Sequence, residues 1–159
     1  MRRRLAAGAA AMLAISLSVP LYGCGRSNEQ IHEEVFDYAQ EAGEKASKLS
    51  DAMPDVLRLL KDGDFEKVAD QVEYIHDLDN EVRAIEGCPK EAEDLKALIE
   101  DASGRFVEAA DYIEKALMTG DLDLMSSYIE LSTSKLEEAN DLVLEATEEM
   151  DRLDEKYSE

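Results

Sequence analysis

The chain has 159 residues, and its 38 acidic residues against 17 basic ones give it a formal net charge of −21. This balance excludes ordinary nucleic-acid binding, because contacts to phosphates need clustered cations. Apolar residues make up 45% of the chain, which has no Trp and only three Phe and three Pro. Such a composition favours a helical globular protein over a disordered or β-rich one. The length predicts one domain.

Residues 1–23 have the features of an export signal. A run of three arginines at positions 2–4 precedes an uncharged apolar stretch, residues 5–19. A basic start, an apolar centre and a small residue before the cleavage point are typical of such signals. Residues 21–24, Leu-Tyr-Gly-Cys, resemble the lipobox of bacterial lipoproteins, with Leu21, Gly23 and Cys24 at the matching positions. The resemblance covers the leader alone.

The lipobox resemblance implies a location and an anchor. Signal peptidase II would cleave before Cys24, and the diacylglyceryl group on its thiol would hold the protein at the extracytoplasmic face of the cell membrane, or at an outer membrane where the envelope has two. Two acyl chains anchor a protein stably without a spanning helix. The alternative is an uncleaved helix, since the apolar run approaches the roughly 20 residues that span a bilayer. Export by the twin-arginine route is a further variant.

Cleavage before Cys24 would make the protein more acidic. It removes the three leader arginines and no acid, which leaves 14 basic and 38 acidic residues and a net charge of −24. Residues 24–30 are predicted to be the lipidated cysteine and a short tether. A domain this acidic is repelled by anionic lipid over roughly 8 Å at physiological salt. We therefore expect it to be tethered to the membrane without lying on it.

Residues 31–159 are predicted to be all-α, an antiparallel up-down four-helix bundle. Apolar residues recur at spacings of three and four in segments 31–60, 65–85, 95–117 and 122–153. Pro54 is expected to kink or interrupt the first helix. The turns at 61–64 and 118–121 both read Gly-Asp, which predicts a left-handed glycine C-cap followed by an aspartate N-cap. Pro89 is expected at the first position of the third helix. Short turns force antiparallel neighbours.

The last segment carries the most regular pattern. It is predicted to be one helix from about residue 121 to 157, on the order of 55 Å long, packed along a heptad seam in the manner of a coiled coil. A second helix shorter than this one would leave part of the seam uncovered, so a homodimer is possible. The predicted seam positions are Leu122, Met125, Ile129, Ser132, Leu136, Ala139, Val143, Ala146, Met150 and Leu153.

Neither histidine is expected to bind a metal. Each follows a glutamate by three residues, as in Glu29 with His32 and Glu73 with His76, and di-iron bundles use Glu-x-x-His pairs. In an antiparallel hairpin the two pairs lie roughly 25 Å apart at 1.5 Å per residue, so they cannot share a site. We predict solvated histidines, no metal and no cofactor.

Cys88 is the one thiol that remains once Cys24 is acylated. It is either an inert, partly buried side chain or, in an oxidising compartment, a crosslink between two copies or a redox handle. No His and acid partners accompany it or any serine, so nucleophilic catalysis is not predicted.

The acidic residues include a regular series in the last helix. Glu137, Asp141, Glu145 and Glu149 are spaced by four, although each like-charge pair at this spacing costs a few tenths of a kcal/mol. This acidic ridge is either a solvated face or a contact surface for cations. The leading prediction is a non-catalytic binding or scaffold module at the cell envelope, with a basic envelope protein or peptide as a possible partner. The alternative is an acidic protein that sequesters divalent cations or cationic peptides.

Overall fold

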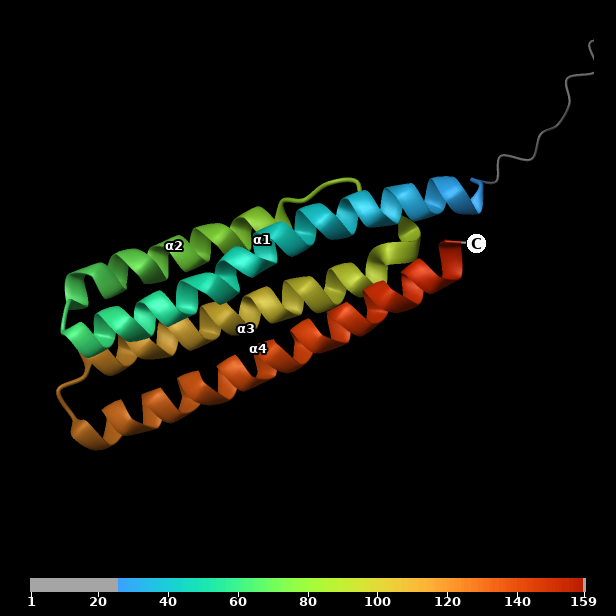
Figure 1. Ribbon diagram of the computed structural model, residues 1–159. Helices are drawn as coiled ribbons and strands as arrows, with labels where there is room; N and C mark the ends of the chain where they lie inside the picture. Colours follow the sequence, from blue (N-terminus) through green and yellow to red (C-terminus); the bar gives the residue numbers. More distant parts are fainter. Residues whose placement is uncertain (1–25, 159) are drawn as a thin grey trace, which may run out of the picture.

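The computed structural model describes residues 26–158, and these residues form helices and turns without a strand. The prediction of an all-α protein with four helices packed against one another is confirmed (Figure 1). None of the helices in this range is both long and apolar enough to cross a membrane. The elements are α1 (Asn28–Asp62), α2 (Phe65–Arg83), the 3-10 helix η1 (Lys90–Ala92), α3 (Glu93–Met118) and α4 (Leu122–Tyr157).

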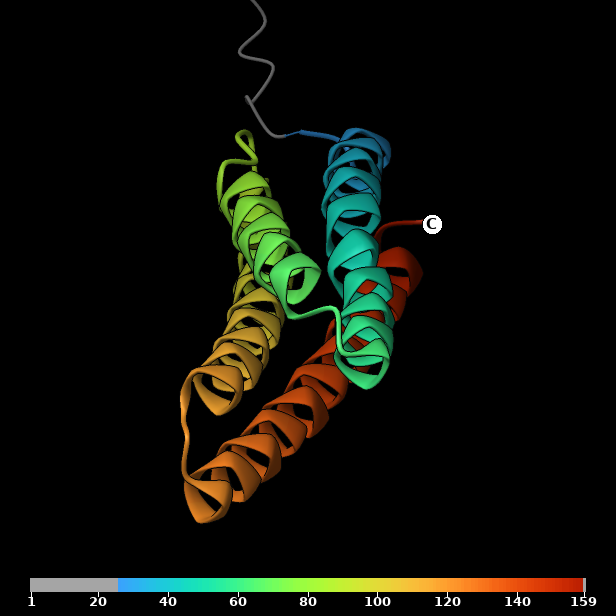
Figure 2. The same cartoon turned by 90° about the vertical axis from the view of Figure 1, so that its left-hand side faces the viewer.

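Consecutive helices run in opposite directions along the molecule (Figure 1). α4 packs mainly against α3 and makes fewer contacts with α1. Near its C-terminus α4 lies close to the start of α1, where His32 Nε2 is 2.7 Å from an Asp154 carboxylate oxygen. Toward its own N-terminus α4 diverges from α1 (Figure 2). One side of α4 is therefore left partly uncovered.

α1 begins earlier and runs further than the sequence pattern suggested. Ser27 caps it with a complete capping box, in which the Ser27 hydroxyl accepts from the backbone N–H of Gln30 and the Gln30 side chain accepts from the N–H of Ser27. The segment 28–30, predicted as tether, is therefore helical. α1 also continues without interruption through Pro54. Pro54 lies on the exposed side of the helix, where water can reach the Ser50 carbonyl that it leaves unbonded.

The two Gly-Asp turns differ in structure although their sequences match. Gly63 has a left-handed conformation with φ 74°, as predicted, but the side chain of Asp64 makes no capping hydrogen bond. At the other turn Asp121 caps α4 by accepting from two backbone N–H groups, whereas Gly120 is not left-handed.

Pro89 is the residue before η1 and has extended backbone angles, so the prediction that it opens the third helix is wrong.

Replacing Gly63 and Gly120 with alanine should affect stability differently, because only Gly63 has a left-handed backbone conformation. Gly63→Ala forces a Cβ into the left-handed region, and we expect a loss of about 1 kcal/mol in the free energy of unfolding. Gly120→Ala should be neutral or stabilising by up to about 1 kcal/mol, because its backbone conformation suits alanine and a Cβ there meets nothing within 4 Å. Urea denaturation of both variants measures the difference, and equal losses would contradict the assignment.

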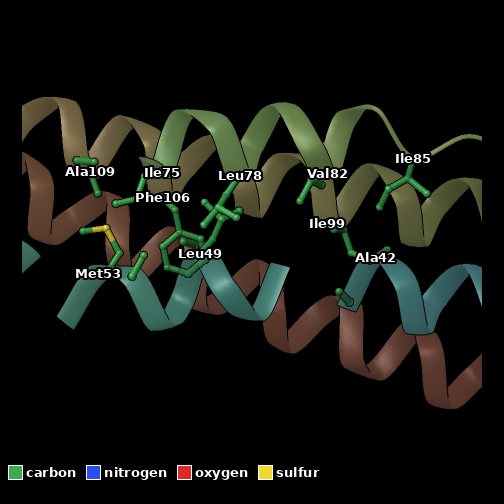
Figure 3. Close-up of a cluster of buried hydrophobic side chains, with 14 of the residues drawn as sticks. Ala42, Leu49, Met53, Ile75, Leu78, Val82, Ile85, Ile99, Phe106 and Ala109 are labelled. Atoms are coloured by element: carbon green, nitrogen blue, oxygen red, sulfur yellow. The ribbon is translucent and has the colours of Figure 1, made fainter. Parts of the chain in front are cut away.

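The core is formed by all four helices, but α4 contributes a narrow stripe. Apolar side chains of α1, α2 and α3 interdigitate around Leu49 and Phe106 (Figure 3). The predicted seam of α4 is only half right, because Leu122, Ile129 and Val143 are exposed. The reason is that α4 has a single close neighbour along most of its length, so only one edge of the seam is covered. The buried residues of α4 recur every seven positions: Ser132, Ala139, Ala146 and Leu153.

Candidate functional site: a groove between α1 and α4

An open groove of about 420 Å³ lies between α1 and α4. Its floor is α3, which contributes Leu95, Ile99 and Ala102. Its size falls within the range of ligand-binding clefts. The walls are a run of small residues on α1 and a mixed apolar and polar set on α4: Ala39, Gly43, Ala46, Ser47, Ser50 and Asp51 on one side, and Val143, Ala146, Thr147, Met150 and Asp151 on the other.

The two helix faces that border this groove are almost free of charge. Residues at spacings of three and four share one face of a helix, and following that spacing outward from the groove gives one uncharged series on each helix. This is notable in a chain in which 35% of residues are charged. The series are Ala39, Gly43, Ala46, Ser50, Pro54 and Leu57 on α1, and Ile129, Thr133, Leu136, Asn140, Val143 and Thr147 on α4.

Acidic residues flank the uncharged faces on their outer sides. On each helix four exposed acids follow at successive spacings of seven, four and seven. We call these sets the α1 and α4 acidic flanks; they are Glu44, Asp51, Asp55 and Asp62, and Glu130, Glu137, Asp141 and Glu148. Arg58 offsets part of the α1 flank, since its guanidinium lies 3.0 Å from Asp55 and 3.8 Å from Asp62. No ion pair with a residue of the range 26–158 offsets the α4 flank.

The predicted acidic ridge does not stay on one face. A step of four residues turns about 40° around a helix with 3.6 residues per turn, so the ridge winds by about 120° from its first member to its last. Glu137 and Asp141 lie in the exposed α4 flank and do not line the groove. Glu145 is exposed, and Glu149 is mostly covered and bonded to Arg152. The ridge is therefore not a single four-carboxylate surface.

Glu149 should titrate differently from an ordinary surface glutamate. Its side chain is 14% exposed and accepts a hydrogen bond of 2.7 Å from Nε of Arg152, which lowers the pKa of the carboxyl below its usual value of 4.5. We expect carbon-detected NMR titration to show this lower pKa in the native chain and a return toward 4.5 in Arg152→Gln.

The lowered pKa of Glu149 also predicts how stability depends on pH. A carboxyl whose pKa is lower in the folded state stabilises that state above its unfolded pKa, and the contribution is lost as the pH falls through the folded value. The native chain should therefore exceed Arg152→Gln in unfolding free energy by the full amount above about pH 5, and this difference should shrink as the pH falls. A difference that grows as the pH falls would contradict the assignment.

The histidines and Cys88 lie apart from the groove's centre and from one another. Each histidine contacts an aspartate of a neighbouring helix: His32 contacts Asp154, and His76 Nε2 is 2.8 Å from an oxygen of Asp111. They are thus bridges between helices and not simply solvated. Within residues 26–158 no three His, Cys, Asp or Glu side chains are grouped closely enough to hold a metal ion. Burial raises the pKa of the Cys88 thiol, which disfavours its reactive thiolate.

A polar network joins α2 to α3 on the side of the molecule away from α4. The Ser103 hydroxyl, which is 1% exposed, donates to an oxygen of Asp79 at 2.6 Å. The other Asp79 oxygen accepts from Nε of Arg83 at 2.9 Å, and Arg83 also donates to the backbone carbonyl of Glu100 at 3.2 Å. These bonds hold the two helices in one relative position. Sequence reasoning did not find this network.

The first described residues pin the N-terminus of α1 to the rest of the molecule. Arg26 forms ion pairs with Glu34 of α1 and with Glu91 of η1, and both Glu91 oxygens accept from it, at 2.6 and 2.8 Å. The predicted leader residues Leu21, Gly23 and Cys24 lie outside the described residues, so the lipobox remains a prediction from sequence.

The chain was compared with family models, with curated proteins and with solved structures, and none of them matches it. Its class is therefore defined by the fold and the site alone. Over residues 26–158 it is an all-helical protein of four packed helices, with a groove between α1 and α4 that two aspartates and several uncharged residues line.

Proposed function

We propose that this protein is a lipid-anchored, non-catalytic binding module at the bacterial cell envelope and that the α1–α4 groove is its binding surface. The observation that carries this proposal is the pair of uncharged faces on α1 and α4, which stand exposed in a highly charged chain. Exposed apolar surface bordered by polar residues is typical of interaction sites. The export signal and the lipobox resemblance supply the proposed location.

Metabolic labelling tests the proposed anchor. Cells that express the chain are grown with radiolabelled palmitate, and we expect label in the native protein and none in Cys24→Ala. Cys88→Ala is the matched control, since it removes the other thiol and should leave the label unchanged. Labelling that persists in Cys24→Ala would overturn lipidation at this residue.

Site-directed photocrosslinking in living cells tests the binding surface. A photoreactive residue at position 43 lies in the groove, whereas one at Asp70 of α2 lies on an exposed face of a helix that does not border it. We expect a discrete adduct from position 43 and none of the same mass from position 70. Identical patterns from both positions would contradict a specific surface.

A second candidate function is sequestration of divalent cations by the α4 flank. It is favoured by the exposed Glu130, Glu137, Asp141 and Glu148 side chains, none of which forms an ion pair with the residues that the structure describes. Separate surface carboxylates lack the preformed cage of a strong calcium site. Calorimetry with calcium at low salt tests this function, and the absence of any heat of binding would remove it.

A further inference from the structure

We propose that the α1–α4 groove binds a cationic amphipathic helix of a partner protein, which lies along the groove as a fifth helix. The inference rests on the proposed binding function and adds the chemistry of the partner. It follows from three features of the described residues, which are the shape of the groove, its length and the charges beside it.

The shape of the groove suits a helix. Ala39, Gly43 and Ser50 on the α1 wall are small, so a second backbone can approach α1 closely, while Leu95 and Ile99 provide an apolar floor. An extended peptide would gain no backbone hydrogen bonds here, because strand addition needs an open sheet edge and both walls are helices. A helix satisfies its own backbone groups and presents one apolar stripe, which is the common mode of binding in a helical groove.

The length of the uncharged surface corresponds to several helical turns. From Ala39 to Asp51 the groove runs for about 18 Å at 1.5 Å per residue. α1 and α4 are antiparallel and meet at His32 and Asp154. Leu57 follows His32 by 25 residues, and Ile129 precedes Asp154 by 25 residues. Leu57 and Ile129 therefore lie at a similar level along the two helices. Their side chains are 48% and 38% exposed.

The exposed residues Leu57 and Ile129 continue the uncharged faces of α1 and α4 beyond the residues that line the groove. Neither α1 nor α4 covers the other at this level, and the two helices diverge in this direction (Figure 2). The uncharged surface from Ala39 to Leu57 is about 27 Å long. A partner helix of about 18 residues matches this length.

The charges beside the groove favour a cationic partner over a second copy of the chain. Asp51 and Asp151 line the groove from opposite walls, and the α1 and α4 acidic flanks continue beside them. Lysines or arginines at the edges of a partner's apolar stripe would meet these carboxylates. A second copy would instead bring its own acidic flanks and, after cleavage before Cys24, a net charge of −24 against the same surface, and like charges across an interface weaken association. An acyl chain carries no charge to match the flanks.

The direct test uses the full chain in phosphatidylcholine nanodiscs and a fluorescent 18-residue peptide of Leu and Lys, with Leu at helical spacings of three and four. We expect saturable binding that weakens as salt is raised, after subtraction of empty nanodiscs. A peptide of the same composition without an apolar face should bind at least tenfold more weakly. Equal binding of the two peptides would overturn the proposal in favour of bulk charge attraction.

Two sets of variants locate the binding. Gly43→Leu fills the groove, and we expect at least tenfold weaker binding. The variant should fold normally, because a Cβ at this position meets nothing within 4 Å and leucine has a higher helix propensity than glycine. Thermal unfolding followed by circular dichroism checks this. Asp51→Lys with Asp151→Lys should weaken binding by a similar factor.

The matched control for the charge variants is Asp70→Lys with Asp77→Lys on exposed positions of α2. It changes the net charge equally and should alter binding no more than twofold. Equal losses of peptide binding in the two double variants would overturn the assignment of the binding site to the groove.

Other occupants give distinct results. Light scattering that shows a dimer of the native chain and a monomer of Gly43→Leu would overturn the proposal and assign the groove to a second copy. Binding of dansyl-undecanoic acid that is lost in Gly43→Leu, without peptide binding, would assign it to an acyl chain. If the peptide fails to bind while the photoreactive residue at position 43 still captures a defined partner, the binding function stands and the cationic helix is wrong.

Discussion

Replacing Leu49 with alanine is expected to reduce the free energy of unfolding by about 3–5 kcal/mol. Leu49 lies on α1 with no exposed surface, among Met53, Ile75, Leu78 and Phe106 in the centre of the molecule (Figure 3). These neighbours come from three helices, so no single side chain can shift to fill the space. The loss therefore combines the apolar surface that the three missing carbon atoms no longer bury with the cavity that they leave. Urea denaturation measures it as a lower midpoint with an unchanged slope.

Leu57→Ala is the matched control, because it makes the same chemical change on the same helix. Leu57 is 48% exposed, so we expect a change within about 0.5 kcal/mol. Leucine and alanine are both good helix formers, which keeps the helix itself intact in both variants. If Leu57→Ala cost as much as Leu49→Ala, the rotation of α1 about its axis would be wrong, and with it the assignment of its uncharged face to the groove.

Helix positions were predictable from the sequence because their physical cause is local. The apolar positions of α2 and α3 recur at spacings of three and four, and the central ones are buried as that spacing requires. Helix ends depend on single side chains and were less predictable. Ser27 with Gln30 forms a capping box whose pattern is visible in the sequence, and this box marks the start of α1 at Asn28.

The covered side of α4 was not predictable from periodicity. A heptad seam contains two series, and a regular spacing does not say which of them a neighbouring helix covers. Three of the four buried residues of α4, Ser132, Ala139 and Ala146, have small side chains that allow α3 to approach closely, whereas Ile129 and Val143 of the other series are larger and exposed. Residue size within the seam is a signal that the spacing alone does not use.

The groove could not be derived from the sequence, because it depends on how α1 and α4 are placed relative to each other. Its residues belong to segments about 100 positions apart, and each uncharged face looks unremarkable by itself. The acidic ridge was predicted from a spacing of four, but that spacing rotates about 40° per step. Spacings of seven, four and seven, as in the α4 flank, keep the acids closer to one side of the helix.

The second large effect is expected from the network between α2 and α3. Asp79→Ala removes the carboxylate that accepts from the buried Ser103 hydroxyl and from Arg83. Hydrogen bonds to charged groups contribute about 1.5–3 kcal/mol each, and a buried donor without a partner is costly. We expect a loss of about 2 kcal/mol for Asp79→Ala and about 1 kcal/mol for Ser103→Ala, because in the second case the carboxylate keeps its bond to Arg83.

A double-mutant cycle isolates the bond between the two helices. The combined variant should lose about 1 kcal/mol less than the sum of the single losses, since the second change removes a group whose partner is already gone. The control cycle uses Asp55 and Arg58, an exposed pair 3.0 Å apart on α1, and we expect a coupling of only a few tenths of a kcal/mol. A coupling near zero for Asp79 and Ser103 would mean that the hydroxyl bonds within its own helix, and the relative position of α2 and α3 would then depend on apolar packing alone.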